Sequence, residues 1–185
     1  RSYCAVRIIS GEFRSRSLQT PPDARVTRPM PDRVRESIFN LLRGHVEGEN
    51  VMDVFAGIGT MGLEALSRGA ASCVFVEQSK PISQLLRANI DMLGVGDRAE
   101  VVASDALGNS PLSAGPSPVH LIFFDPPYAM VTQEQSRARC LEQFGRLIAR
   151  LDETGFAMLR TPWPLRETAT DPSSPDADLH IAGAA

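Results

Sequence analysis

The chain of 185 residues is poor in cysteine, histidine and lysine, and these shortages exclude several classes of protein. Cys4, Cys73 and Cys140 lie too far apart for a disulfide framework or a metal-ligand pair, which is typical of a reducing compartment. The three histidines are equally scattered, so we expect neither a metal site nor a Ser-His-Asp arrangement. The longest apolar run, residues 121–124, cannot cross a bilayer and no secretory signal is visible, so we expect a cytoplasmic location.

Positive charge is concentrated near the N-terminus. Residues 1–43 contain nine arginines and four acidic residues, a net charge of +5, whereas residues 44–185 contain ten basic and eighteen acidic residues, a net charge of −8. This asymmetry predicts that the N-terminal region contacts phosphate, because arginine forks onto phosphate and stacks on bases. A merely solvated face remains the alternative, since Lys80 is the only lysine and the arginines can reflect compositional bias. The candidate contacts are Arg7, Arg14, Arg16 and Arg33.

Short apolar runs alternate with helical patterns along most of the chain. The runs expected to form strands cover residues 51–54, 73–77, 100–103, 121–124 and 156–159. The fourth run is apolar throughout, which is typical of a strand buried on both faces. Strands that alternate with helices predict an α/β fold with a parallel sheet between two layers of helices.

The first predicted helix begins at Asp32, which we expect to be its N-cap. Val34, Ile38, Leu41 and Leu42 are expected to form its apolar face. The other expected helices cover residues 63–68, 81–93 and 141–151, and a loop rich in Pro, Ser and Gly covers residues 108–118.

The N-terminal residues are expected to form an extension of their own. Residues 7–10 and 16–18 resemble two short strands around Gly11, which predicts a hairpin. We therefore expect an extension over residues 1–31 and a second unit over residues 32–185.

The most informative segment lies between the first strand and its following helix. Asp53 lies near the end of the first expected strand, just before a glycine-rich turn. In this turn, Gly57, Gly59 and Gly62 have the spacing of a dinucleotide-binding fingerprint. Glu77 ends the next strand, twenty residues after Gly57, where a carboxylate accepts both hydroxyls of a ribose. The turn therefore predicts a nucleotide-like cofactor, either NAD or S-adenosylmethionine. Past the third strand, Asp105 is placed to receive an adenine amino group, with Ala106 beside it.

A second segment separates these two cofactors. Asp125, Pro126, Pro127 and Tyr128 follow the fourth strand, at the sheet edge where ligands bind in open α/β folds. The Asp125 carboxylate and a main-chain carbonyl, that of Pro126, can hold an exocyclic amine with its lone pair aimed at a methyl sulfonium. Tyr128 offers a ring on which an extruded base stacks. The two segments together indicate methyl transfer from S-adenosylmethionine to an amino nitrogen of a base, with no metal.

Three separated stretches also resemble one family, the RsmD-type 16S rRNA guanine-N2 methyltransferases. These stretches are residues 7–11 with 27–29 and 32–40, residues 53–70, and residues 125–128. The resemblance implies a class I S-adenosylmethionine-dependent methyltransferase fold, which is Rossmann-like with a mostly parallel sheet, and a small N-terminal hairpin. It also implies that the substrate is the N2 of a guanine in 16S ribosomal RNA. By the same resemblance, Arg28 and Pro29 lie near the cofactor and the basic N-terminal region lies near RNA.

The chain departs from that family at several positions. Met30 stands where the family usually has threonine, and Ile58 where it often has serine. The family closes its sheet with an antiparallel hairpin, but residues from about 163 onward are expected to be irregular and truncated, too short for a clear last strand.

Other functions remain open at this point. An N6-adenine DNA methylase shares the Asp-Pro-Pro-Tyr motif, and only the basic N-terminal region and the family resemblance favour RNA. An NAD-dependent oxidoreductase would use Glu77 but gives Asp125 no role, and a non-catalytic RNA-binding protein is a further alternative. The expected partner is ribosomal RNA, the small subunit or an assembly intermediate, bound by a monomer.

Overall fold

The computed structural model describes residues 6–22, 30–161 and 179–183. Its sheet has six strands in the order β3-β2-β1-β4-β5-β6. The strands are β1 (Asn50–Val54), β2 (Ser72–Val76), β3 (Ala99–Val102), β4 (Val119–Phe124), β5 (Leu151–Arg160) and β6 (Leu179–Gly183). The helices are α1 (Asp32–Leu41), α2 (Thr60–Ser67), α3 (Lys80–Leu93), α4 (Ser110–Ser113), α5 (Tyr128–Thr132) and α6 (Glu134–Ile148). No helix among the described residues is long and apolar enough to span a membrane.

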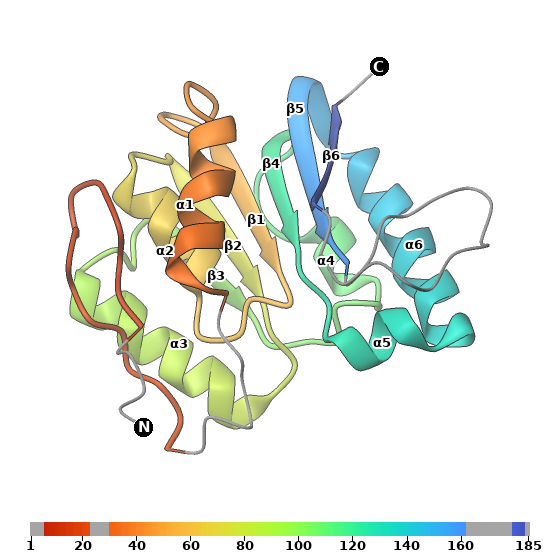
Figure 1. Cartoon of the computed structure of the whole chain (residues 1–185), viewed down its shortest axis with the longest axis horizontal. Coiled ribbons are helices and arrows are strands. Elements are labelled where there is room, and N and C mark those ends of the chain that lie inside the picture. Colours follow the sequence, from red (N-terminus) through yellow and green to blue (C-terminus); the bar gives the residue numbers. More distant parts are fainter. Residues whose placement is uncertain (1–5, 23–29, 162–178, 184–185) are drawn as a thin grey trace.

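Helices cover both faces of the sheet, as expected. Figure 1 shows α1, α2 and α3 on one side of the strands and α4, α5 and α6 on the other. Because successive strand residues point to opposite faces, Leu121 and Phe123 of β4 join the core under α1–α3, whereas Ile122 and Phe124 join the core under α6. All six β4 residues are buried, which confirms the interpretation of its apolar run.

The strand order places a topological switch point between β1 and β4. The chain proceeds outward from β1 to β2 and β3, then returns to the other side of β1 to form β4. The helices that follow β1 and β4 therefore diverge to opposite faces and leave a crevice at the carboxyl ends of the two strands. Both segments that the sequence singled out, residues 53–62 and residues 125–128, lie at this edge.

The N-terminal residues form the expected short hairpin, which packs against α2. Arg7 and Ser17 form an antiparallel bridge, and the turn between them contains Gly11 at φ 83°. A Cβ at Gly11 would lie 1.8 Å from the carbonyl oxygen of Ser67, so only glycine permits this close contact. Two successive hairpin N–H groups, of residues 9 and 10, donate to the buried carboxylate of Glu64. The hairpin is thereby tied to the helix that follows the glycine-rich turn.

The expected cap of α1 was wrong, and its expected face was correct only in part, since Ile38 and Leu42 are buried as predicted. The N-cap is Pro31, and Asp32 is instead the first helical residue, which pairs with Arg7 and Arg35. Val34 and Leu41, expected in the core, are 41% and 64% exposed. The buried face is rotated from the expected one because it includes Arg35. The guanidinium of Arg35 is fully buried beside Glu64 and donates a hydrogen bond to the main chain of the hairpin. An apolar-periodicity argument cannot anticipate a buried ion pair.

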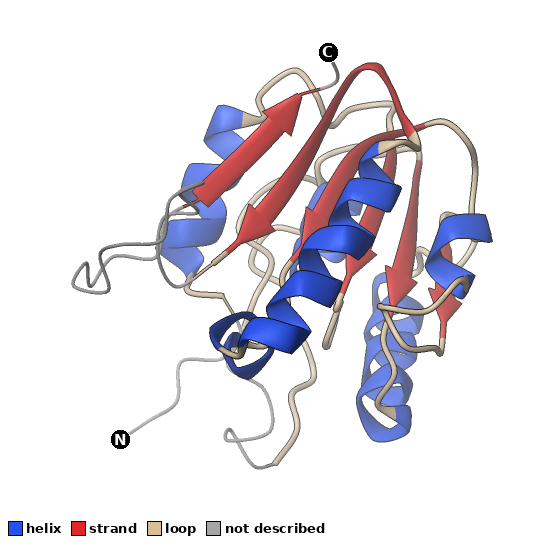
Figure 2. Ribbon diagram, turned by 90° about the vertical axis from the view of Figure 1, so that its right-hand side faces the viewer, coloured by secondary structure: helices blue, strands red, loops and turns tan. Residues whose placement is uncertain are grey.

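Corrections also apply toward the C-terminus. The helix expected to reach Leu151 ends at Ile148, because the chain turns there and Leu151 begins β5. The loop over residues 108–118 contains the short helix α4, and α5 was not anticipated. The expectation that no clear last strand forms was wrong, since β6 pairs antiparallel with β5. Figure 2 shows β6 at the sheet edge with its arrow opposed to that of β5.

Candidate active site

A cavity of about 450 Å³ opens at the carboxyl ends of the central strands. Its walls come from the glycine-rich turn after β1, from the segment after β2, from residues 125–128 after β4 and from the last residue of β5. This volume lies in the range of small-molecule and cofactor sites. Met30 and Ile58, the two departures from the family pattern, also line the cavity.

The glycine-rich turn bends sharply between β1 and α2. Phe55, Gly57 and Gly59 all have positive φ, at 65°, 57° and 89°. Gly59 is the N-cap of α2, and a Cβ there would lie 2.5 Å from a methyl carbon of Leu86. Gly57 differs, because it lines the cavity and a Cβ there would meet no atom of the described residues within 4 Å. The turn therefore leaves its backbone open to a ligand at Gly57 and is closed by packing at Gly59.

Glu77 lies in the cavity wall directly after β2, as the sequence placed it. One carboxylate oxygen accepts the N–H of Gly57 at 3.0 Å, and the other accepts the N–H of Ser79 at 2.7 Å. These two bonds fix the carboxylate against the turn and hold the turn itself in place. A ligand that contacts both Glu77 and the backbone of Gly57 therefore finds its binding site already in place.

Asp53 lies beneath the turn and does not line the cavity. It is 2% exposed, and its carboxylate accepts the N–H of Gly62 at 2.9 Å. Burial raises the pKa of Asp53 to about 8, although the hydrogen bond from Gly62 opposes that rise. The structure therefore gives Asp53 a position that braces the turn from below.

Asp125 and Tyr128 also line the cavity, with the two prolines between them. Burial raises the pKa of Asp125 to about 6, and the charge of Arg160 opposes the rise. Tyr128 is 43% exposed, an unusual exposure for a large aromatic residue, and it begins α5. A largely buried acceptor and an exposed aromatic ring thus both line the cavity.

Arg160 is a cavity residue that the sequence reasoning missed. It ends β5, and its Nε lies 2.9 Å from Asp125 Oδ1, while its guanidinium carbon lies 5.3 Å from the centre of the Tyr128 ring. The contact with Asp125 is an ion pair, since neither of these two buried atoms has a hydrogen-bond partner of acceptable geometry within the described parts of the chain. The available signal was an arginine that directly follows an apolar strand, at the edge where parallel strands end.

Comparison with known proteins identifies a family whose model matches most of the chain. Residues 6–162 match the model of the family described as conserved hypothetical protein 95. The chain belongs to this family. Ribosomal RNA small subunit methyltransferase D of Escherichia coli is 42% identical over 123 residues, which make up 66% of this chain and 60% of that protein. The chain thus spans only about three fifths of that relative's length. The family resemblance inferred from the sequence motifs is confirmed by both matches.

Solved structures that are similar to this chain have the same architecture. A putative methyltransferase from Escherichia coli, yhhF, is 34% identical and superposes with a TM-score of 0.68 over 84% of this chain and 79% of its own. A more distant SAM-dependent O-methyltransferase from Thermotoga maritima, 17% identical with a TM-score of 0.55 over 74% of this chain and 46% of its own, shares the fold. The expected class I methyltransferase fold is therefore confirmed.

The remaining predicted site residues occupy different places. Ala106 lines the cavity, whereas Asp105 is exposed, does not line it and accepts the N–H of Leu107. Arg28 and Pro29 lie outside the described residues. The arginines proposed for phosphate contact are all exposed, and they are Arg7, Arg14, Arg16 and Arg33.

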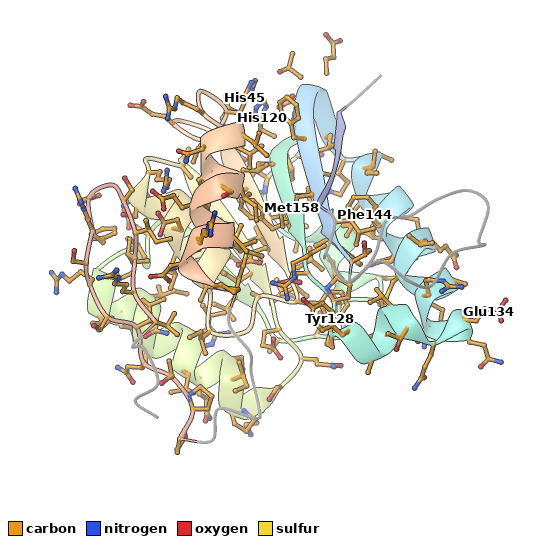
Figure 3. All side chains as sticks on the ribbon, viewed as in Figure 1. His45, His120, Tyr128, Glu134, Phe144 and Met158 are labelled. Carbon is orange, nitrogen blue, oxygen red and sulfur yellow. The ribbon has the colours of Figure 1, made fainter. Side chains whose placement is uncertain are left out.

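One group of possible metal ligands is found away from the cavity. Among the described residues, only Glu49, His120 and Asp152 bring three ligand atoms within 4.8 Å of one another. His120 Nδ1 is 2.9 Å from Asp152, and its ring stacks on His45. Figure 3 places His45 and His120 at the opposite end of the sheet from Tyr128. This group therefore has no part in the cavity, and no metal is assigned to it.

Proposed function

We propose that this protein transfers the methyl group of S-adenosylmethionine to the exocyclic N2 of a guanine in small-subunit ribosomal RNA. One observation carries the proposal: a single cavity joins the Gly57–Glu77 wall, suited to a nucleoside, to the Asp125–Tyr128 wall, suited to an amino-bearing base. The name of the Escherichia coli relative supports ribosomal RNA as the substrate.

The cofactor half of the cavity fits the nucleoside of S-adenosylmethionine. Glu77 presents a carboxylate that is already fixed by two N–H groups, so accepting two ribose hydroxyls requires little reorganisation. Gly57 leaves room for close approach of the ligand, and Ala106 forms part of the wall. In this proposal Asp53 and Gly59 shape the turn from behind. The roles of Asp105, Arg28 and Pro29 at the cofactor stay predictions from the sequence. The bound cofactor supplies a methyl group activated by a positively charged sulfur.

The target half orients the nucleophile. Asp125 and the carbonyl oxygen of Pro126 accept the two hydrogens of the amine, which turns the nitrogen lone pair toward the methyl group. Pro126 and Pro127 have no N–H groups to compete for these acceptors, and their rings restrict the backbone. Tyr128 stacks on the base, worth about 1–3 kcal/mol. Holding the reactants in line supplies much of the acceleration, up to about 7–11 kcal/mol in favourable cases.

The transfer needs no covalent intermediate on the protein. The amine nitrogen forms a bond to the methyl carbon as the carbon–sulfur bond breaks. The electron pair of the broken carbon–sulfur bond remains on sulfur. The methylated nitrogen then loses one proton, for which the Asp125 carboxylate is the nearest acceptor in the arrangement proposed. The exposed arginines of the hairpin and α1 bind RNA phosphates in the same proposal and hold the target strand over the cavity.

Labelled methyl transfer tests this function. The protein is incubated with methyl-labelled S-adenosylmethionine and, separately, with 16S ribosomal RNA, assembled small subunits and duplex DNA. We expect label in a guanine N2 of the ribosomal RNA or the subunit. Label in adenine N6 of duplex DNA alone would replace this proposal with the DNA methylase. Thermal stabilisation by NADH without stabilisation by S-adenosylhomocysteine would contradict the cofactor assignment.

A further inference from the structure

Arg160 and Asp125 are brought together by the register of β4 and β5. Phe124 pairs with Leu159, so the residue after each of them lies at the same sheet edge, inside the cavity wall. The resulting ion pair has an Nε–Oδ1 distance of 2.9 Å, with both side chains largely buried. The position of Arg160 follows from backbone pairing on an interior strand and does not depend on a loop.

We propose that Arg160 is a positioning residue that holds Asp125 as an ionised, correctly oriented acceptor for the target amine. This inference rests on the proposed function, because it assigns Asp125 to the amine. Arg160 acts through Asp125 and through the ring of Tyr128, over which its guanidinium lies.

The surroundings of Asp125 explain why such a partner is needed. Burial disfavours its charge, and Asp125 Oδ1 has no hydrogen-bond donor within the described parts of the chain. The other titratable groups of the cavity wall are Glu77 after β2 and Tyr128 at the start of α5, and Asp53 of β1 lies below. Glu77 and Asp53 are acids, so neither favours a negative charge on Asp125. Among the residues that the structure describes, Arg160 is therefore the cation that favours the ionised form.

The protonation state of Asp125 decides what it can do. An ionised carboxylate only accepts hydrogen bonds, so it receives an amine hydrogen and directs the nitrogen lone pair outward. A protonated carboxyl group has become a donor, and it competes for that same lone pair. Burial raises the pKa of Asp125 and the charge of Arg160 lowers it, with a net value of about 6. Loss of this charge therefore raises the pKa further toward neutrality.

The experiment compares three variants across pH. Arg160→Gln removes the charge but keeps a polar side chain, Arg160→Lys keeps the charge but lacks the planar fork, and Arg139→Gln removes a charge from the exposed surface of α6 as the matched control. For each, methyl transfer to ribosomal RNA is measured from pH 5 to 9. The carboxyl NMR signal of Asp125, assigned by its loss in Asp125→Asn, is titrated without RNA. Affinity for S-adenosylhomocysteine and the melting temperature report on folding.

We expect the acid limb of the wild-type profile to move to higher pH in Arg160→Gln, together with the NMR titration of Asp125. A midpoint one pH unit higher lowers turnover on the acid side about tenfold and leaves the alkaline plateau nearly unchanged. Arg160→Lys should restore the midpoint, and Arg139→Gln should match the wild type.

Other outcomes would overturn the inference. An equal loss of turnover at every pH, not restored by lysine, would make Arg160 a direct contact to the base or a structural residue. An unchanged Asp125 titration in Arg160→Gln would remove the link between the two residues. If wild-type protein methylates no RNA, but the Asp125 titration still moves in Arg160→Gln, the proposed function fails and the effect of Arg160 on Asp125 stands.

Discussion

The carboxylate of Asp53 accepts the N–H of Gly62 at 2.9 Å and thereby joins the end of β1 to the first turn of α2. This bond lies beneath the glycine-rich turn and spans it. Because Asp53 is almost fully buried, its charge is disfavoured and its pKa is raised to about 8. The brace under the cofactor wall is therefore also a source of pH dependence.

Asp53 should make the folded protein less stable as pH rises. Its folded pKa of about 8 exceeds its ordinary value of 3.8, so the folded state holds a proton that the unfolded state releases. The stability contributed is fully present below about pH 4 and is lost as pH rises through about 8, with an upper bound of roughly 6 kcal/mol. Asp53→Asn cannot ionise and should weaken this dependence. Urea unfolding at several pH values measures it, and parallel curves for the two proteins would contradict the assignment.

Gly62→Ala should destabilise the protein. A Cβ at this position would lie 2.3 Å from a ring carbon of Phe75 and 2.6 Å from the sulfur of Cys73, so the helix would have to move away from β2. Overpacking of this kind costs about 1–3 kcal/mol. Gly145→Ala on α6 is the control, since a Cβ there meets nothing within 4 Å in the described parts of the chain. This substitution should stabilise the helix by up to about 1 kcal/mol. Equal melting temperatures for the two variants would show that the α2–β2 contact is looser than described.

Asp125→Ala and Glu77→Ala should separate turnover from cofactor binding. Asp125→Ala should remove turnover and leave S-adenosylhomocysteine affinity nearly intact, because its carboxylate is assigned to the amine. Glu77→Ala should first weaken the binding of the cofactor. The substitution removes the proposed contact to the ribose, and it leaves the N–H groups of Gly57 and Ser79 without their acceptor. Calorimetry and single-turnover assays distinguish the two. A large loss of cofactor affinity in Asp125→Ala would mean that the roles are misassigned.

Replacing Arg14 and Arg16 should lower RNA affinity and flatten its salt dependence. Both side chains are exposed on the hairpin, where contact with phosphate requires no rearrangement of the core. Loss of two phosphate contacts should reduce the slope of log K against log salt by about two. Arg139→Ala, which removes one positive charge from the exposed surface of α6, provides a control for charge loss outside the hairpin. An unchanged slope in the double variant would make the basic hairpin a solvated face.

The fold and much of the candidate site could be predicted from the sequence because their signals are local. The turn around Gly57 and Gly59 needs residues that tolerate positive φ, and the uniformly apolar run of residues 121–124 in β4 is recognisable as a buried strand from its composition alone. Asp125 directly follows that strand, so its place at the ligand-binding edge follows from chain order.

The tertiary structure decided what depends on partners distant in the chain. Arg35 is buried because Glu64 lies beside it, so the face of α1 could not be read from apolar spacing. Arg160 reaches Asp125 only because β5 lies beside β4 in a particular register, over a separation of 35 residues. A sequence pattern specifies which backbone conformations and burial a segment favours, whereas ion pairs and cavity walls depend on which segments pack side by side.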